Sequence, residues 1–169
     1  MHMFAVVLIS GGFLSMGVIA ARNLRCCANE LREVSIGIQV IKRELKYSLA
    51  PLNELLQMAS AQTAGETRLF FDDCKRKIEA ADGELFETIW RHALERRKFC
   101  LKQADYLILM QLGSVLGRYD ADEQIMVLSS TVEQLEQRYL DAKEESRRMG
   151  RVYTVLGFSV GMFMLILFL

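Results

Sequence analysis

The segment 152–169 constrains the fold of this chain more than any other, because it reads VYTVLGFSVGMFMLILFL and carries neither charge nor proline. As a helix it would extend roughly 27 Å, close to the roughly 30 Å thickness of a bilayer's hydrocarbon core. Arg147, Arg148 and Arg151 precede it, as basic residues do where a span leaves the cytoplasm. A core helix is the alternative, but in a small domain it normally keeps a polar face. The sequence therefore predicts a transmembrane helix over 152–169.

A second uncharged segment, 1–21, reads MHMFAVVLISGGFLSMGVIAA. All 21 basic and all 21 acidic residues therefore lie between Arg22 and Arg151. A cleaved signal peptide is the alternative, but the first two residues carry no Lys or Arg and Ile19-Ala20-Ala21 is a poor cleavage site. Basic residues follow the segment instead of preceding it. This pattern predicts an uncleaved transmembrane helix over 1–21, with the next segment in the cytoplasm and both termini outside.

The charged segment 22–151 has the spacing of amphipathic helices throughout its length. Apolar residues recur at intervals of three and four, which places them on one side of a helix. Pro51, the one proline, predicts the end of the first long helix near Leu49 and the start of a second. No alternation of apolar and polar residues indicates a strand. The expected helices are 22–49 in continuation of the first span, 51–60, 67–81, 84–98, 102–116, and a last one from 122 into the terminal span.

The apolar sides of these helices predict the core. The two long helices carry matching apolar stripes, so we expect them to pair antiparallel. The segment 102–116 is the most hydrophobic part of the domain and is expected at its centre. Residues expected to face inward on the shorter helices include Leu69, Phe70, Leu85 and Trp90. The predicted fold is an all-α cytoplasmic helical bundle over 22–151, flanked by transmembrane helices over 1–21 and 152–169.

Two pairs of glycines have the G-x-x-x-G spacing that lets another backbone approach closely. In the first pair, we expect close internal packing at Gly113 and a helix C-cap at Gly117. The second pair, Gly157 and Gly161, lies in the terminal span and is a candidate for packing against another transmembrane helix. Glycine is common in such spans, so a chance occurrence is the alternative for this second pair.

No catalytic or metal-binding set of residues is found in the sequence. The two histidines, His2 and His92, are far apart, and no phosphate-binding loop, zinc-protease or serine-hydrolase motif occurs. Asp120-x-Asp122 begins like a calcium loop, but Ile125 stands where glycine is needed. The net charge of zero gives no basic surface for nucleic acid. We therefore expect no enzymatic activity, metal, cofactor, nucleic acid or small-molecule substrate.

The segment 118–123 is the densest polar break between the helices. Arg and Tyr are frequent anchors of protein interfaces, so Arg118, Tyr119 and Asp120 form a candidate docking site for a cytoplasmic partner. The alternative is a solvated turn in which Asp122 caps the last helix.

Several short motifs occur in order along the chain: Tyr47-Ser48-Leu49-Ala50-Pro51-Leu52-x-Glu54, Phe70-Phe71, Trp90, Leu112-Gly113-x-x-Leu116-Gly117-x-x-Asp120-x-x-x-Gln124 and Tyr153-x-x-Leu156-Gly157. Together they resemble the motifs of the stage III sporulation protein AB family of endospore-forming bacteria. The resemblance covers nearly the whole chain, and it depends on the order and spacing of the motifs together with the two uncharged ends. The basic residue that usually stands near the start of the first span in this family is absent.

This resemblance implies an integral membrane component of the channel between mother cell and forespore, with a soluble domain similar to the helical domains of type II secretion F proteins. It implies a platform without catalytic residues, located in the mother-cell membrane that faces the forespore. The partners it implies are sister sporulation membrane proteins and a secretion-type ATPase. The alternative from another class is a membrane-anchored adaptor that tethers a cytoplasmic protein and has no role in a channel.

Overall fold

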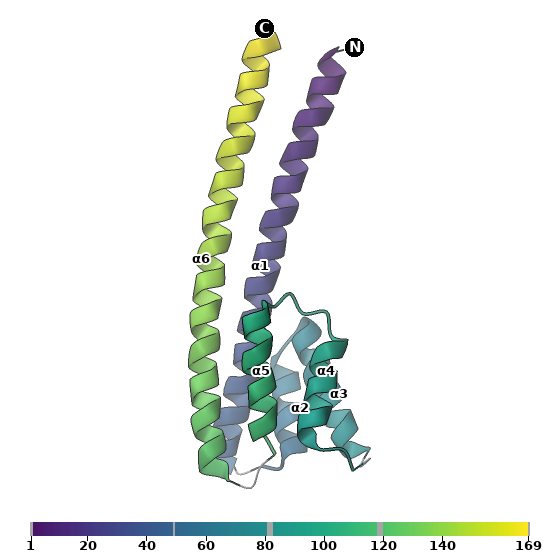
Figure 1. Ribbon diagram of the computed structural model, residues 1–169, viewed down its shortest axis with the longest axis vertical. Helices are drawn as coiled ribbons and strands as arrows, with labels where there is room; N and C mark the ends of the chain where they lie inside the picture. Colours follow the sequence, from purple (N-terminus) through teal and green to yellow (C-terminus); the bar gives the residue numbers. More distant parts are fainter. Residues whose placement is uncertain (1, 49, 81–82, 118–119, 169) are drawn as a thin grey trace. The chain divides into compact units, whose positions relative to one another are not determined.

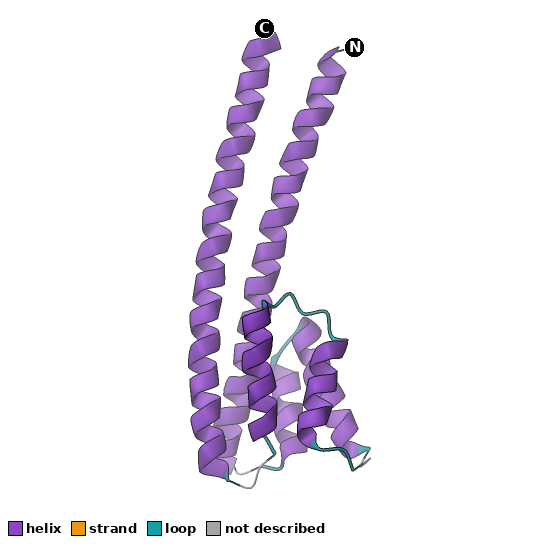
Figure 2. Cartoon of the chain, in the orientation of Figure 1, coloured by secondary structure: helices purple, strands orange, loops and turns teal. Residues whose placement is uncertain are grey.

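The computed structural model of the chain consists of α-helices joined by turns (Figure 2). It describes residues 2–48, 50–80, 83–117 and 120–168, with the side chains of 23–48, 50–80, 83–117, 120, 122–152, 155, 156, 159 and 162. No strand occurs among these residues, so the predicted all-α class is confirmed. The helices are α1 (His2–Ser48), α2 (Leu52–Gln62), α3 (Gly65–Glu79), α4 (Phe86–Arg96), α5 (Gln103–Val115) and α6 (Ala121–Phe168).

The chain divides into two compact units. The first unit joins residues 1–28 to 140–169, the outer parts of α1 and α6, and the second unit comprises 29–139. Within the first unit, the beginning of α1 and the end of α6 lie at the same end (Figure 1). Among the described residues, no helix combines the length and the apolar character that crossing a membrane requires.

Within the second unit, α1 and α6 run in opposite directions (Figure 1). A hydrogen bond of 2.8 Å from Gln39 Nε2 to Glu136 Oε1 joins the two helices. The apolar stripes of both helices are buried here, which confirms the antiparallel pairing within this unit. Each large apolar side chain contributes about 1.5 to 3 kcal/mol when it is fully buried. The buried side chains of the two stripes are Leu31, Val34, Ile38, Ile41, Leu45, Leu128, Val132 and Leu135.

Pro51 separates α1 from α2, as predicted. Its φ of −63° and its missing N–H suit the position just before a helix. The Pro51 carbonyl accepts the N–H groups of Glu54 at 2.9 Å and Leu55 at 3.1 Å, which begins the hydrogen bonding of α2. The predicted break at Leu49 falls on a residue outside the described part of the chain.

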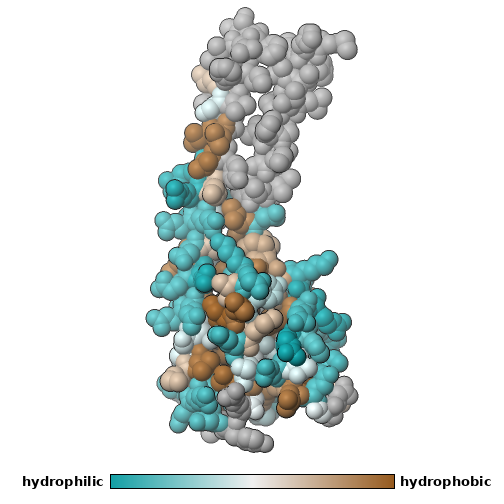
Figure 3. Space-filling view, in the orientation of Figure 1, coloured by the Kyte–Doolittle hydropathy of each residue, from teal (hydrophilic) through white to brown (hydrophobic). Residues whose placement is uncertain are grey.

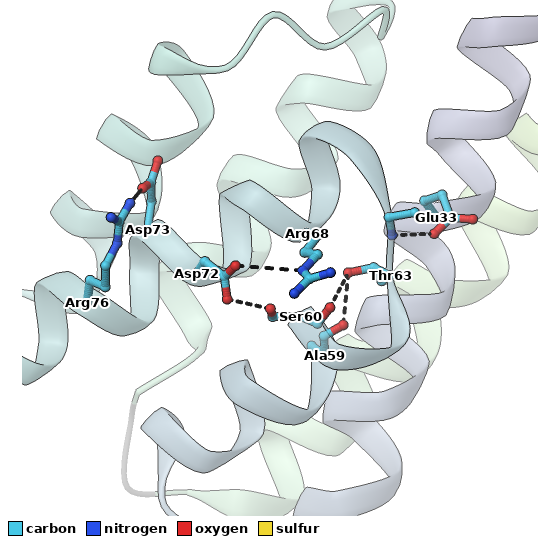
Figure 4. A network of polar contacts seen from close by, with 9 residues as sticks. Glu33, Ala59, Ser60, Thr63, Arg68, Asp72, Asp73 and Arg76 are labelled. Carbon is cyan, nitrogen blue, oxygen red and sulfur yellow. Dashed lines mark hydrogen bonds and ion pairs between the residues drawn. The ribbon is translucent and has the colours of Figure 1, made fainter.

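The turn between α2 and α3 is attached to α1 by polar contacts (Figure 4). The Ala64 N–H donates a hydrogen bond of 2.8 Å to Glu33 Oε2 on α1. Thr63 Oγ1 donates to the Ala59 carbonyl at 2.9 Å, which satisfies one of the free carbonyls at the end of α2. These bonds fix where α3 begins and hold the α2–α3 hairpin against the long helix.

Aromatic side chains from α3 and α4 form the centre of the second unit. The ring of Trp90 is 1% exposed and lies edge-on to Phe70, with the ring centroids 4.7 Å apart. Its Nε1 donates a hydrogen bond of 2.7 Å to the carbonyl of Leu109 on α5, so the indole joins three helices. Phe71 and Phe99 are also buried in this cluster. The inward orientation predicted for Trp90 and Phe70 is confirmed.

Two helical glycines make room for these rings. A Cβ at Gly113 would lie 2.3 Å from Cδ1 of Trp90, and a Cβ at Gly37 would lie 2.3 Å from Cε2 of Phe71. Both distances are far shorter than any van der Waals contact. The close packing predicted for Gly113 is therefore confirmed, and Gly37 on α1 serves the Phe71 ring in the same way.

Two predicted core residues are exposed instead. Leu69 is 44% exposed. The buried side of α3 is centred on Thr67, Phe70 and Phe71. Leu69 lies two positions from both Thr67 and Phe71, so its side chain points away from that side of the helix. Leu85 is 76% exposed, because it precedes α4 with an extended backbone and is not on a helical face.

The expected central position of α5 was also wrong. Leu107 in this helix is 53% exposed, and α5 is buried along one side only. Its high hydrophobicity does not place it at the centre, because the other helices also supply fully buried side chains, such as Ile38 of α1, Leu56 of α2 and Leu135 of α6. The residues of α5 that are buried are Asp105, Leu109, Leu112 and Gly113.

Candidate interaction surface

The turn between α5 and α6 contains the predicted docking residues. Gly117 follows the C-cap of α5 with φ of +92°, a left-handed conformation that favours glycine, so its predicted capping role is confirmed. Arg118 and Tyr119 lie outside the described part of the chain. The structure describes Asp120, whose side chain is exposed just before α6.

Asp120, and not Asp122, caps α6. Its Oδ1 accepts the N–H groups of Asp122 at 3.0 Å and Glu123 at 3.3 Å, and its carbonyl accepts the N–H of Gln124 at 3.2 Å. The carboxylate is also placed where the positive end of the helix dipole stabilises it. The prediction that Asp122 is the cap was wrong, because α6 begins one residue earlier than expected and places Asp122 in its first turn. One oxygen of the Asp120 carboxylate is thus already used within the chain.

The glycines Gly157 and Gly161 belong to α6, but their surroundings lie outside the described part of the chain. Their predicted role in packing against another helix therefore stays a prediction.

A groove that the sequence did not predict lies between α1, the end of α2 and α6. Its volume is about 550 Å³, and its lining is of mixed polar and apolar character. One wall carries Lys42 and Arg43 of α1, and the other carries Glu133 and Glu136 of α6. Apolar residues of α1 beside its main apolar stripe could have indicated this groove, because a helix that is buried on one side only does not need them. The lining residues are Ile36, Gln39, Val40, Lys42, Arg43, Gln62, Ser129, Val132, Glu133 and Glu136.

The surface drawn in Figure 3 is largely hydrophilic over the second unit, with small separate apolar patches. Such isolated apolar side chains are normal on soluble domains. The most exposed described ones in this unit are Tyr47, Leu85, Leu107 and Met126. None of these features alone identifies a partner.

A buried carboxylate on α3, that of Asp73, makes structural contacts in the second unit. Asp73 on α3 accepts hydrogen bonds from Arg76 on the same helix and from Arg97 at the end of α4 (Figure 4 shows the Arg76 contact). Burial raises the pKa of Asp73, but the hydrogen bonds from Arg97 and Arg76 outweigh it and hold the pKa below its usual value. Arg97 Nη1 also lies 3.8 Å from Glu66 Oε2. The cluster therefore joins α3 to the end of α4.

The groups that could perform chemistry are poorly suited to it. Burial raises the pKa of the Cys74 thiol, with a smaller contribution from the nearby Asp73 carboxylate, and a protonated buried thiol is a weak nucleophile. Among the residues that the structure describes, no group of three His, Cys, Asp or Glu side chains could hold a metal ion. The described Asp73, Arg76 and Arg97 side chains thus serve contacts between elements, beside a buried and protonated Cys74 thiol.

The family model of stage III sporulation protein AB matches residues 2–169. This chain belongs to the stage III sporulation protein AB family. The resemblance predicted from the motifs is confirmed, and membership of this family supports a role in sporulation. The motif residues Pro51, Trp90 and Gly113 all make packing or helix-boundary contacts in the structure.

A solved structure of a stage III sporulation protein AB is similar in fold to this chain. The TM-score is 0.62 at 22% sequence identity, and the match covers 70% of this chain and 94% of that chain. Comparison with curated proteins gives no significant match. At this sequence identity, the structural likeness shows a shared fold and says nothing about the activity of this chain.

Proposed function

We propose that this chain is a non-enzymatic, membrane-anchored platform of the secretion-like channel between mother cell and forespore, required for endospore formation. The observation that carries the proposal is the match of one sporulation family to residues 2–169, the uncharged ends included. The all-α second unit fits a platform, because its buried charges and aromatic rings join helices to one another.

Membrane anchoring is the first part of this proposal. Segments 1–21 and 152–169 contain no charged residue, and the helices α1 and α6 continue through them without a break. Arginines flank the inner end of each segment, which favours a cytoplasmic location for the domain between them. We therefore propose two spans in the mother-cell membrane facing the forespore, with the domain in the mother-cell cytoplasm and both termini outside.

Cysteine labelling tests this orientation. Lys77 is exposed on α3, so the Lys77→Cys variant presents a thiol on the proposed cytoplasmic side. In vegetative cells that produce the chain, an impermeant maleimide should label Lys77→Cys above the wild-type level only after permeabilisation. A His2→Cys variant should be labelled in intact cells. Labelling of Lys77→Cys in intact cells would show that the domain is outside.

Partner binding is the second part of the proposal. By resemblance, the partners are sister sporulation membrane proteins and a secretion-type ATPase, and we propose that the α5–α6 turn contributes to their docking. Arg118 and Tyr119 are the side chains in this turn best suited to an interface, because Arg and Tyr combine large contact area with hydrogen bonding. Asp120 is expected to act mainly as the cap of α6.

The Arg118→Ala/Tyr119→Ala variant tests the docking. We expect it to fold and reach the membrane, but to recover the ATPase or a sister membrane protein about tenfold less from sporulating cells in mild detergent. The matched control is Tyr47→Ala/Arg91→Ala, which removes an exposed Tyr and an exposed Arg elsewhere in the second unit. Equal recovery by both variants would exclude the turn as a docking site. Recovery of a soluble partner without any channel component would favour the adaptor function instead.

A further inference from the structure

The charges nearest the two uncharged ends all have the same sign. After segment 1–21 come Arg22 and Arg25, and the first acidic residue is Glu30. Before segment 152–169 come Arg147, Arg148 and Arg151, and the nearest acidic residue is Glu145. The net charge of the whole chain is zero, so this excess of basic residues is confined to the ends of the two uncharged segments. We call the four of these arginines whose side chains the structure describes, Arg25, Arg147, Arg148 and Arg151, the arginine collar.

The collar arginines of α6 share one side of their helix. At 3.6 residues per turn, Arg147, Arg148 and Arg151 fall within an arc of about 100°. All three are exposed, and so is Arg25 on α1. In the part of the chain that the structure describes, none of these four guanidinium groups forms an ion pair. They are therefore available to an external anion.

Three described side chains that follow the collar along α6 are apolar and exposed. Val152, Val155 and Leu156 are exposed in the first unit, directly beyond Arg151. A partner that covers this surface must offer anionic groups beside an apolar phase. Guanidinium groups bind phosphate through paired N–H donors, and an anionic lipid headgroup presents a phosphodiester at the edge of the hydrocarbon region.

We infer that the arginine collar binds the headgroups of anionic phospholipids and so gives this chain a preference for an anionic membrane surface. The inference rests on the membrane anchoring proposed above and adds a lipid class to it. The attraction is electrostatic, so it weakens with salt. Each cationic side chain at such a surface contributes about a fivefold change in affinity.

The test compares lipids around the full chain reconstituted in bilayers. Spin-labelled phosphatidylglycerol and phosphatidylcholine report which lipid the protein immobilises at its surface. We expect the wild-type chain to prefer phosphatidylglycerol by about fivefold or more. In the Arg147→Gln/Arg148→Gln/Arg151→Gln variant, the preference should fall by about threefold or more, because only Arg22 and Arg25 remain. The Arg147→Lys/Arg148→Lys/Arg151→Lys variant should keep most of the preference, since it keeps the charge.

The matched control removes the same charge elsewhere. The Arg91→Gln/Arg96→Gln/Lys98→Gln variant neutralises three exposed side chains of the second unit and should leave the preference unchanged. An equal preference for both lipids in the wild type, or an equal loss in the control, would overturn the role of the collar. A carbonate wash separates the two proposals: release of the wild-type chain from membranes would overturn the anchoring, whereas retention without lipid preference would overturn the collar alone.

Discussion

Replacing Trp90 by alanine is expected to lower the free energy of unfolding of the 22–151 segment by about 3 to 5 kcal/mol. The indole ring is 1% exposed and contacts the Phe70 ring, so its removal leaves a large cavity among α3, α4 and α5. The loss of Nε1 also leaves the Leu109 carbonyl without the hydrogen bond that it accepts from the ring. Denaturant unfolding of both forms, followed by circular dichroism, measures the difference.

Two variants separate the contributions of the ring and its N–H group. Trp90→Phe keeps an aromatic side chain and loses the hydrogen bond to Leu109, so it should cost less than Trp90→Ala. Arg91→Ala changes the exposed neighbour and should alter the free energy of unfolding by about 0.5 kcal/mol or less. A decrease in the free energy of unfolding of less than about 1 kcal/mol for Trp90→Ala would mean that the indole is accessible. A partner surface would then explain the tryptophan at this position better than core packing does.

The fold was predictable from the sequence where one local rule decides the outcome. Pro51 marks the boundary of two helices because its ring fixes its own φ and keeps the preceding residue out of the helical conformation. Gly117 marks another boundary because glycine readily adopts the positive φ that ends a helix. The stripe of α1 was predictable for a similar reason, since one buried side of a long helix repeats many times. Leu85 and Leu107 were not predictable in this way. Leu85 precedes α4 with an extended backbone, and the exposure of Leu107 depends on which helices cover α5. The periodicity of a single helix contains neither piece of information.

The candidate site was less predictable than the fold. The turn proposed for docking was chosen for its polar residues, but the role of Asp120 depended on a helix start that differs by one residue from the expected one. The groove between α1, α2 and α6 was missed, because it forms from three segments that are far apart in sequence. Residues such as Gln39 and Glu136 have no motif in common, and only the antiparallel pairing of their helices brings them together.

Gly113→Ala is expected to destabilise the 22–151 segment by about 3 kcal/mol, although alanine is the better helix former. The added Cβ would lie 2.3 Å from Cδ1 and 2.6 Å from Cγ of Trp90. The indole cannot retreat easily, because it is buried and its Nε1 is hydrogen-bonded to Leu109 on the same helix as Gly113. The backbone of α5 would therefore have to move away from α4. Denaturant unfolding measures the loss.

A double-mutant cycle decides whether the overlap with Trp90 causes this loss. In the Trp90→Ala background the ring is absent, so Gly113→Ala should become neutral or stabilise the segment by up to about 1 kcal/mol, the difference in helix propensity. The coupling free energy between the two positions should then be about 3 kcal/mol. If Gly113→Ala lowers the free energy of unfolding equally with and without the indole, the glycine is required for another reason, such as the approach of a different backbone. Trp90 then does not determine which residue α5 can carry at this position.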